Sequence, residues 1–237
     1  MNTKNNESYL SNFMRGFIGI FVYMMLNLFI GPILTIIGIN VSELTRKEAV
    51  FISMIVSFIV IIVLLLLSWK VLKKDWKEYK KNWKKLLSKH VKYWVLALVL
   101  MFVANLIIAI IFNRLSSAND ETIRKIFDVM PLYIILEAVI LAPITEELVF
   151  RQSVRYIIKN KWVFIITSAL LFGFMHTLAS LETLADFLYI IPYSIPGGFF
   201  AYMLYEEDNV LVPMSFHMIH NTLAMILLII SKITGIV

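Results

Sequence analysis

The sequence predicts an all-α fold, a polytopic bundle of seven or eight membrane-spanning helices. Of the 237 residues, 60% are hydrophobic and only 16% are charged, whereas a soluble domain of this length carries more charge. The mean hydropathy is +0.82. Apolar runs long enough to cross a bilayer also recur along the chain. We therefore expect a single integral membrane domain over residues 1–237, with no separate soluble domain.

Each predicted span is an apolar run of about 17–25 residues, the length that crosses the hydrocarbon core. The runs are 14–39, 49–69, 93–113, 131–154, 162–178, 185–205 and 210–231. The first is too long for the core of a signal peptide, so we expect it to be retained as a helix. The sixth contains Pro192, Pro196 and the pair Gly197-Gly198, which predict a broken helix. Such a break opens a substrate entrance or lets helices pack closely, and close packing is the favoured interpretation.

The distribution of lysines predicts how the chain is oriented in the cell membrane. Ten lysines fall in residues 70–92, and Lys and Arg are enriched in cytoplasmic loops. Counting spans from this segment puts the N-terminus and loop 151–161 on the cytoplasmic side as well. Loops 40–48 and 114–130 then lie outside, and the acidic turn 206–208 lies inside.

The net charge of +6 is concentrated in that lysine-rich segment, so it indicates contact with an anionic lipid bilayer and not with nucleic acid. Large apolar residues recur there at three- and four-residue steps: Trp69, Leu72, Trp76, Tyr79, Trp83 and Leu86. This pattern is typical of a basic amphipathic helix on the membrane surface. A site for a specific partner is the less favoured alternative.

Polar residues inside three of the apolar runs are the candidate functional groups. They are Glu146, Glu147 and Arg151 in the fourth run, His176 in the fifth, and His217, His220 and Asn221 in the seventh. A charge near the bilayer centre costs at least about 2.5–3.5 kcal/mol, so such residues are rarely incidental. On a helix, Glu147 and Arg151 are i,i+4 neighbours and can pair. Glu146 points about 100° away from that pair and has no basic partner on its own helix.

Together these groups form a set that suits hydrolysis. A buried glutamate can take a proton from water, a histidine can share that task or protonate a leaving amine, and a His with an Asn can donate to an oxyanion. One alternative is that they only bond helices together. Another is a zinc site of Glu146, His176, His217 and His220, although the HExxH spacing is missing. Cysteine is absent, which excludes a thiol nucleophile and a thiolate metal site.

These residues also occur in three recognisable motifs. Glu146-Glu147-x-x-x-Arg151 matches EExxxR, Phe172-x-x-x-His176 matches FxxxH, and His217-x-x-x-Asn221 matches HxxxN. In this order, within successive apolar runs, they resemble the CAAX prenyl protease and bacteriocin-processing family. That family, abbreviated CPBP and also called Abi, includes the type II CAAX prenyl endopeptidases. The resemblance covers about residues 131–225, which we take as the catalytic core.

The resemblance implies an intramembrane glutamic endopeptidase that needs neither metal nor cofactor. It implies that Glu146 and His176 activate the water and that His217 and Asn221 stabilise the oxyanion. Glu147 and Arg151 look like a supporting pair, and Phe172 looks like a supporting residue of the second motif. The resemblance assigns no role to His220.

The substrate that follows from the resemblance is a peptide or a membrane protein. The composition suits a bacterial chain, in which a prenylated CAAX tail is not the expected substrate, and bacterial relatives are associated with bacteriocin maturation, self-immunity and peptide processing. Two other functions compete with the enzyme. One is a catalytically silent immunity or scaffold protein. The other is a proton-coupled transporter, although the chain shows no internal repeat.

Overall fold

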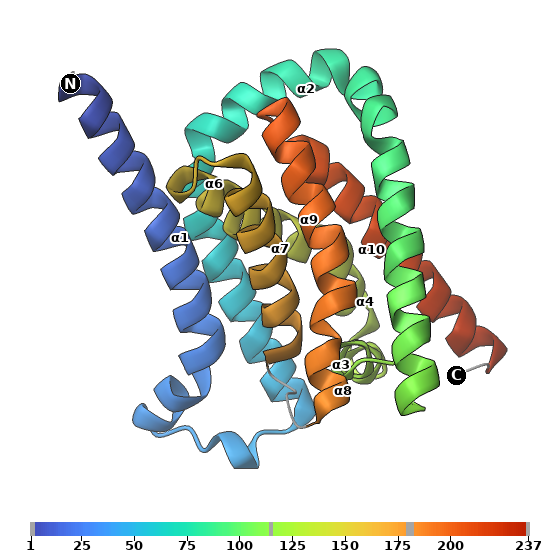
Figure 1. The fold of residues 1–237 in the computed structure, drawn as a ribbon. Coiled ribbons are helices and arrows are strands. Elements are labelled where there is room, and N and C mark those ends of the chain that lie inside the picture. Colours follow the sequence, from blue (N-terminus) through green and yellow to red (C-terminus); the bar gives the residue numbers. More distant parts are fainter. Residues whose placement is uncertain (1–2, 114–115, 179–182, 236–237) are drawn as a thin grey trace.

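The computed structural model describes residues 3–113, 116–178 and 183–235, and every regular element in these ranges is a helix. The helices stand side by side in a bundle (Figure 1). This confirms the predicted all-α fold. Four helices of the described ranges are long and apolar enough to cross a membrane: Leu10–Ile36, Arg46–Phe112, Asp186–Glu207 and Leu211–Thr234.

The N-terminal half consists of two long helices, α1 (Thr3–Ile36) and α2 (Arg46–Phe112), joined through the short 3₁₀ helix η1 (Val41–Glu43). Helix α2 rises through the bundle, arches over one end and descends again (Figure 1). It therefore joins two predicted spans and the basic segment 70–92 in one helix. Its sequence contains neither proline nor glycine, so no residue in it favours a break.

The C-terminal half begins with α3 (Ala118–Phe127) and a helical run from Pro131 to Ile157. That run comprises α4 (Pro131–Leu136), the π-helical segment η2 (Glu137–Leu141), α5 (Ala142–Glu146), the π-helical segment η3 (Glu147–Ser153) and α6 (Val154–Ile157). The remaining helices are α7 (Lys161–Thr177), α8 (Leu184–Leu188), α9 (Ile190–Glu207) and α10 (Leu211–Thr234). The fourth predicted span is not one regular α-helix, because its two π-helical segments interrupt it. The fifth predicted span corresponds to α7, which is shorter than the four long helices.

The sixth predicted span is broken, but the break lies at Tyr189, between α8 and α9, and not at the prolines and glycines. Helix α9 runs unbroken through Pro192, Pro196 and Gly197. Pro192 lies in the first turn, where its missing N–H removes no bond of the helix. The close packing expected there is present. A Cβ on Gly197 would lie 3.2 Å from the Cα of Ala169, and one on Gly173 would lie 2.6 Å from the carbonyl oxygen of Ile190. Small residues thus let α7 and α9 approach each other closely.

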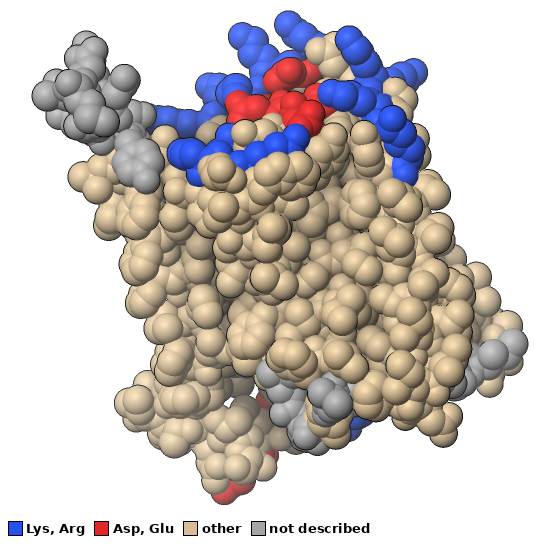
Figure 2. Space-filling model, in the orientation of Figure 1, with Lys and Arg blue, Asp and Glu red and all other residues tan. Residues whose placement is uncertain are grey.

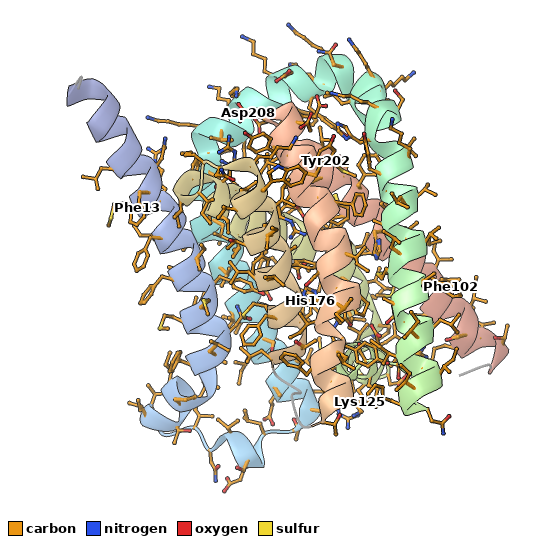
Figure 3. The ribbon with its side chains drawn as sticks, in the orientation of Figure 1. Phe13, Phe102, Lys125, His176, Tyr202 and Asp208 are labelled. Atoms are coloured by element: carbon orange, nitrogen blue, oxygen red, sulfur yellow. The ribbon has the colours of Figure 1, made fainter. Side chains whose placement is uncertain are left out.

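The motif-bearing residues lie in the middle of the bundle. Leu148, Val149 and Phe150 of η3 are buried among side chains of α1, α2, α7, α9 and α10. Helix α1 comes so close to η3 that a Cβ on Gly16 would lie 2.5 Å from the carbonyl oxygen of Ser153. Figure 3 shows His176 inside the bundle and Phe102 on the outer side of α2. Large apolar side chains on the outside are the surface that lipid would cover.

Charged side chains gather at the end of the bundle that the arch of α2 crosses (Figure 2). Three ion pairs connect this arch and the start of α7 to the acidic C-terminal end of α9: Lys74–Asp208 at 2.8 Å, Lys89–Glu207 at 2.6 Å and Lys161–Glu206 at 2.6 Å. We call these three pairs the basic rim. Their contacts put segments 70–92, 151–161 and 206–208 at the same end of the molecule, as the sequence predicts.

Candidate active site

A cavity of about 630 Å³ lies between the helices of the C-terminal half and the last part of α2, and the predicted catalytic residues line it. Glu146, His176, His217 and Asn221 all line it, although they come from three elements far apart in the sequence, α5, α7 and α10. His220 lines it as well. The structure therefore brings the three sequence motifs together around one space.

Glu146 faces histidines from two other helices. Its Oε1 lies 3.9 Å from Nε2 of His176, and its Oε2 lies 3.5 Å from Nε2 of His217. A separation of 3.9 Å is too long for a direct hydrogen bond but lets one water molecule bond to both groups. The Glu146 side chain is 13% exposed, so it opens into the cavity. The sequence predicts that Glu146 has no basic partner on its own helix, and the structure agrees. Its two histidine neighbours belong to other helices, which only the tertiary fold brings close.

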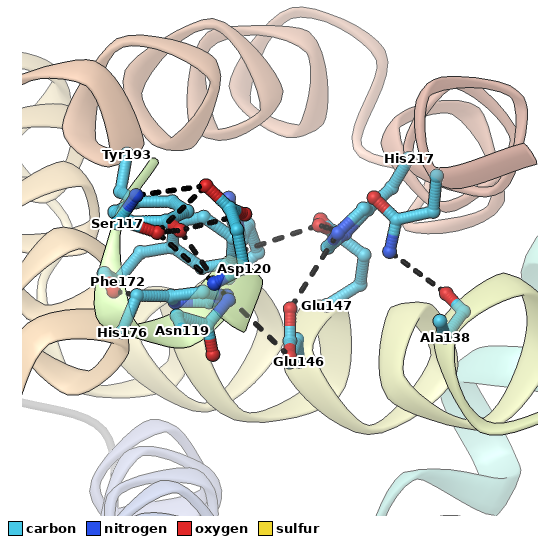
Figure 4. A network of polar contacts seen from close by, with 12 residues as sticks. Ser117, Asn119, Asp120, Ala138, Glu146, Glu147, Phe172, His176, Tyr193 and His217 are labelled. Carbon is cyan, nitrogen blue, oxygen red and sulfur yellow. Dashed lines mark hydrogen bonds and ion pairs between the residues drawn. The ribbon is translucent and has the colours of Figure 1, made fainter. Parts of the chain in front are cut away.

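Glu147 is fully buried and holds two partners. Its Oε1 lies 3.3 Å from Nη1 of Arg151, and both side chains are 0% exposed. The predicted i,i+4 pair is therefore present, although the backbone there is π-helical. The same Oε1 lies 2.8 Å from Nδ1 of His217 (Figure 4). The two adjacent glutamates thus flank one imidazole, an arrangement that the helix geometry of a single span does not predict.

His176 is oriented by the residue one turn before it. Its Nδ1 lies 2.9 Å from the carbonyl oxygen of Phe172, which can only accept, so Nδ1 carries the hydrogen. In the neutral ring Nε2 is then a lone-pair acceptor, and it is the atom that faces Glu146. The Phe172 ring lies 4.2 Å from the His176 ring and 4.3 Å from Cζ of Arg151. The phenylalanine of the second motif therefore packs between the histidine and the buried arginine.

Asn221 and His220 occupy the cavity wall on α10. Nδ2 of Asn221 donates to the carbonyl oxygen of Ala138 at 2.8 Å, which ties α10 to η2 and leaves its second N–H free of that bond. Nδ1 of His220 is buried and has no hydrogen-bond partner among the described residues.

Several residues that line the cavity carry no signal in the motifs. Glu137 of η2 accepts a hydrogen bond from Ser57 at 3.1 Å, and as a third acid in an apolar run it could have been found from sequence. Tyr193, Asp120 and Arg124 also line the cavity. The sequence positions of these three residues give no sign that they belong to the site. Asp120 and Arg124 of α3 come close to Tyr193 of α9 only in the tertiary structure.

The metal alternative can be compared with the same geometry. Within the described ranges, no three His, Asp or Glu side chains are arranged to hold one metal ion. The chelation experiment below tests this alternative directly.

Comparison with known proteins shows which family the core of the chain is similar to. Residues 128–223 match the family described as type II CAAX prenyl endopeptidase Rce1-like. This confirms the resemblance predicted from the three motifs, over the same part of the chain, and the class it defines is that of CAAX-type membrane endopeptidases.

Two curated relatives are similar to the chain. A Mycoplasma capricolum subsp. capricolum protein named "Uncharacterized protein" is 32% identical over 149 residues, which cover 57% of this chain and 43% of the relative. A Bacillus subtilis protein named "Putative membrane peptidase YdiL" is 27% identical over 114 residues, which cover 47% of this chain and 43% of the relative. The chain thus matches less than half the length of each relative. No solved structure matches it.

Proposed function

We propose that the protein is a membrane endopeptidase that hydrolyses a peptide bond of a membrane-associated peptide or protein with a water activated by Glu146 and His176. The observation that carries the proposal is the convergence of the three motifs on one cavity, with Glu146 facing two histidines. The family match over residues 128–223 supports the same reaction class.

The separation between Glu146 and His176 suits a water bonded to both side chains. Glu146 takes one proton from this water, and the oxygen of the water forms a bond to the carbonyl carbon of the substrate. The electron pair of the C=O double bond moves to the carbonyl oxygen and forms the oxyanion. When the C–N bond breaks, the proton passes to the leaving nitrogen, and the oxyanion returns to a carbonyl.

His217 and Asn221 are the proposed donors to the oxyanion. Because Nδ1 of His217 bonds to Glu147, its Nε2 can donate only when the ring carries a second proton. In that imidazolium form, each ring N–H has a carboxylate to face, Glu147 on one side and Glu146 on the other. Once Glu146 is neutralised by the proton of the water, the Nε2–H is available to the oxyanion. The second N–H of Asn221 completes the pair.

The proposal is tested with purified protein in detergent and a library of fluorogenic peptides. Cleavage by the wild type that disappears in Glu146→Ala and persists in Glu78→Ala supports it, because Glu78 is an exposed acid on the arch of α2. Peptide binding without cleavage would favour a silent scaffold or immunity protein. Proton-coupled uptake into vesicles without cleavage would favour a transporter.

The mechanism requires no metal ion, so activity should survive exhaustive treatment with EDTA and phenanthroline. The measurement is the cleavage rate before and after chelation. Loss of activity that added zinc restores would assign Glu146 and the histidines to a metal site instead.

The N-terminus and segment 70–92 are proposed to be cytoplasmic, because the ten lysines of that segment follow the positive-inside rule. Ser88 of the arch and Ser42 of η1 are both exposed, at opposite ends of the bundle (Figure 1). In intact cells, an impermeant thiol reagent should label Ser42→Cys and not Ser88→Cys, against a cysteine-free background. The reverse labelling would invert the orientation.

A further inference from the structure

A second polar network lies on the cavity wall beside His176 and joins α9 to the start of α3 (Figure 4). The hydroxyl of Tyr193 lies 2.6 Å from Oγ of Ser117. Oγ of Ser117 in turn donates to the Asp120 carboxylate at 2.7 Å. Nδ2 of Asn119 donates to the Tyr193 hydroxyl at 3.3 Å. These contacts form a hydrogen-bonded chain that ends on a carboxylate, an arrangement in which each bond strengthens the next.

The same tyrosine packs on the proposed catalytic histidine. The rings of Tyr193 and His176 are stacked, with centroids 4.8 Å apart and planes inclined by 29°. Among the described residues, the other ring in contact with His176 is that of Phe172, which belongs to the same helix as the histidine. Tyr193 is thus the ring from another helix that limits where the His176 imidazole can lie.

The partners of Tyr193 are themselves fixed. Ser117 is the N-cap residue of α3, and its Oγ accepts from the backbone N–H of Asp120 at 3.1 Å. Asp120 returns the contact by accepting from the backbone N–H of Ser117 at 3.2 Å. This capping box holds both side chains in one orientation. The position of the Tyr193 hydroxyl is therefore set by the helix start it bonds to.

We propose that Tyr193 is a positioning residue for His176, held in place by Ser117 and Asp120 at the start of α3. The inference rests on the proposed function, because it assigns Tyr193 to the geometry of the water-activating pair. The Glu146–His176 separation of 3.9 Å leaves little tolerance for a water that bonds to both. A displacement of the His176 ring by about 1 Å can lower the rate about 10²-fold.

The kinetic test compares Tyr193→Phe, which keeps the ring, with Tyr193→Leu, which removes it. We expect kcat to fall about 10-fold in the first and about 10²-fold in the second, with KM unchanged. Tyr205→Phe, on the far turn of the same helix and outside the cavity, should leave both constants unchanged. Ser117→Ala removes one of the three contacts of the hydroxyl and should lower kcat by no more than Tyr193→Phe does. The double variant should lower kcat no further than Tyr193→Phe alone, because the contact between Ser117 and Tyr193 is already lost in that variant.

A purely structural role would lower thermal stability and leave the kcat of the folded fraction unchanged, and that outcome would overturn the inference. Wild-type cleavage with unchanged kcat in both Tyr193 variants would overturn it while the proposed function stands.

A spectroscopic measurement tests the inference independently of any substrate. In protein labelled with ¹⁵N-histidine, the His176 signals are those that His176→Gln removes. Tyr193→Phe keeps the stacked ring, so a shift or broadening of the His176 signals in this variant reports the loss of the hydroxyl contact. Unchanged His176 signals in both Tyr193→Phe and Ser117→Ala would contradict the positioning role, even in a protein that cleaves none of the peptides.

Discussion

Two clusters of charged side chains among the described residues differ in burial: one lies buried at the cavity, and the other is exposed on the basic rim. Lys74 and Asp208 of the rim are 2.8 Å apart with side chains 59% and 79% exposed, whereas Glu147 and Arg151 are 3.3 Å apart and fully buried. The shorter pair is the weaker one, because water and salt screen it. Burial, and not distance, therefore decides which charges matter for stability.

The buried cluster is itself divided between two adjacent carboxylates. Glu147 bonds to Arg151 and His217 and has no exposed surface. Glu146 opens into the cavity and faces its histidines at longer distances. One glutamate is thus suited to holding the site together and its neighbour to taking a proton. The four predictions below use this contrast, from the largest expected effect to the smallest.

Glu146→Gln should reduce cleavage by about 10²–10⁴-fold or more, because the amide cannot act as a general base. Thermal stability in detergent should change little, since Glu146 lies on the cavity surface. The cleavage rate and the melting temperature are measured on the same preparation. A variant that retains wild-type turnover would remove Glu146 from the reaction.

Glu147→Gln should lower the free energy of unfolding by about 3–5 kcal/mol, because it leaves the Arg151 guanidinium buried without its anion. Denaturation in mixed detergent measures the loss. The double variant Glu147→Leu with Arg151→Met should be more stable than Glu147→Leu alone, since it removes both charges together. If the double variant is no more stable than Glu147→Leu alone, the buried ion pair between Glu147 and Arg151 does not contribute to stability as predicted.

His217→Ala and Asn221→Ala should each lower kcat by about 10²–10³-fold, the effect of losing one oxyanion donor. Asn221→Asp makes a sharper comparison, because a carboxylate at this position cannot donate to an oxyanion when ionised. The measurement is kcat from steady-state kinetics. Equal rates for Asn221→Ala and the wild type would leave Asn221 with only its bond to Ala138.

Lys74→Ala should lower stability by about 1 kcal/mol or less, because its partner Asp208 is exposed. Cleavage should not change, since the basic rim lies outside the cavity. Melting curves at low and high salt check this prediction. A loss as large as that of Glu147→Gln would show that the two clusters are not energetically distinct.

The sequence predicts the fold class and the members of the site because hydropathy marks the helices and i,i+4 spacing marks their polar faces. Contacts between side chains of different helices are not predicted by hydropathy or by spacing within one helix. The bond from His217 to Glu147 joins residues 70 positions apart, and no single-helix argument predicts it. Tyr193 was missed for the same reason, since its role depends on α3 approaching α9. The break expected in the sixth span lies at Tyr189, ahead of α9, and not at the prolines and glycines, where α9 packs closely against α7.

The π-helical segments η2 and η3 have a consequence for how related sequences are compared. In η2 the Ala142 N–H bonds to the carbonyl of Glu137, five residues back, so the segment holds one residue more than an α-helical turn needs. Deleting one residue from 138–141 would let the backbone return to a regular α-helix with the same hydropathy. Glu137 and Glu146 would then keep nearly the same angle relative to each other, because the wide turn already accommodates the extra residue within one turn. A related chain with one residue fewer between these two acids can therefore present them in the same way, so an alignment has to allow a one-residue gap at η2.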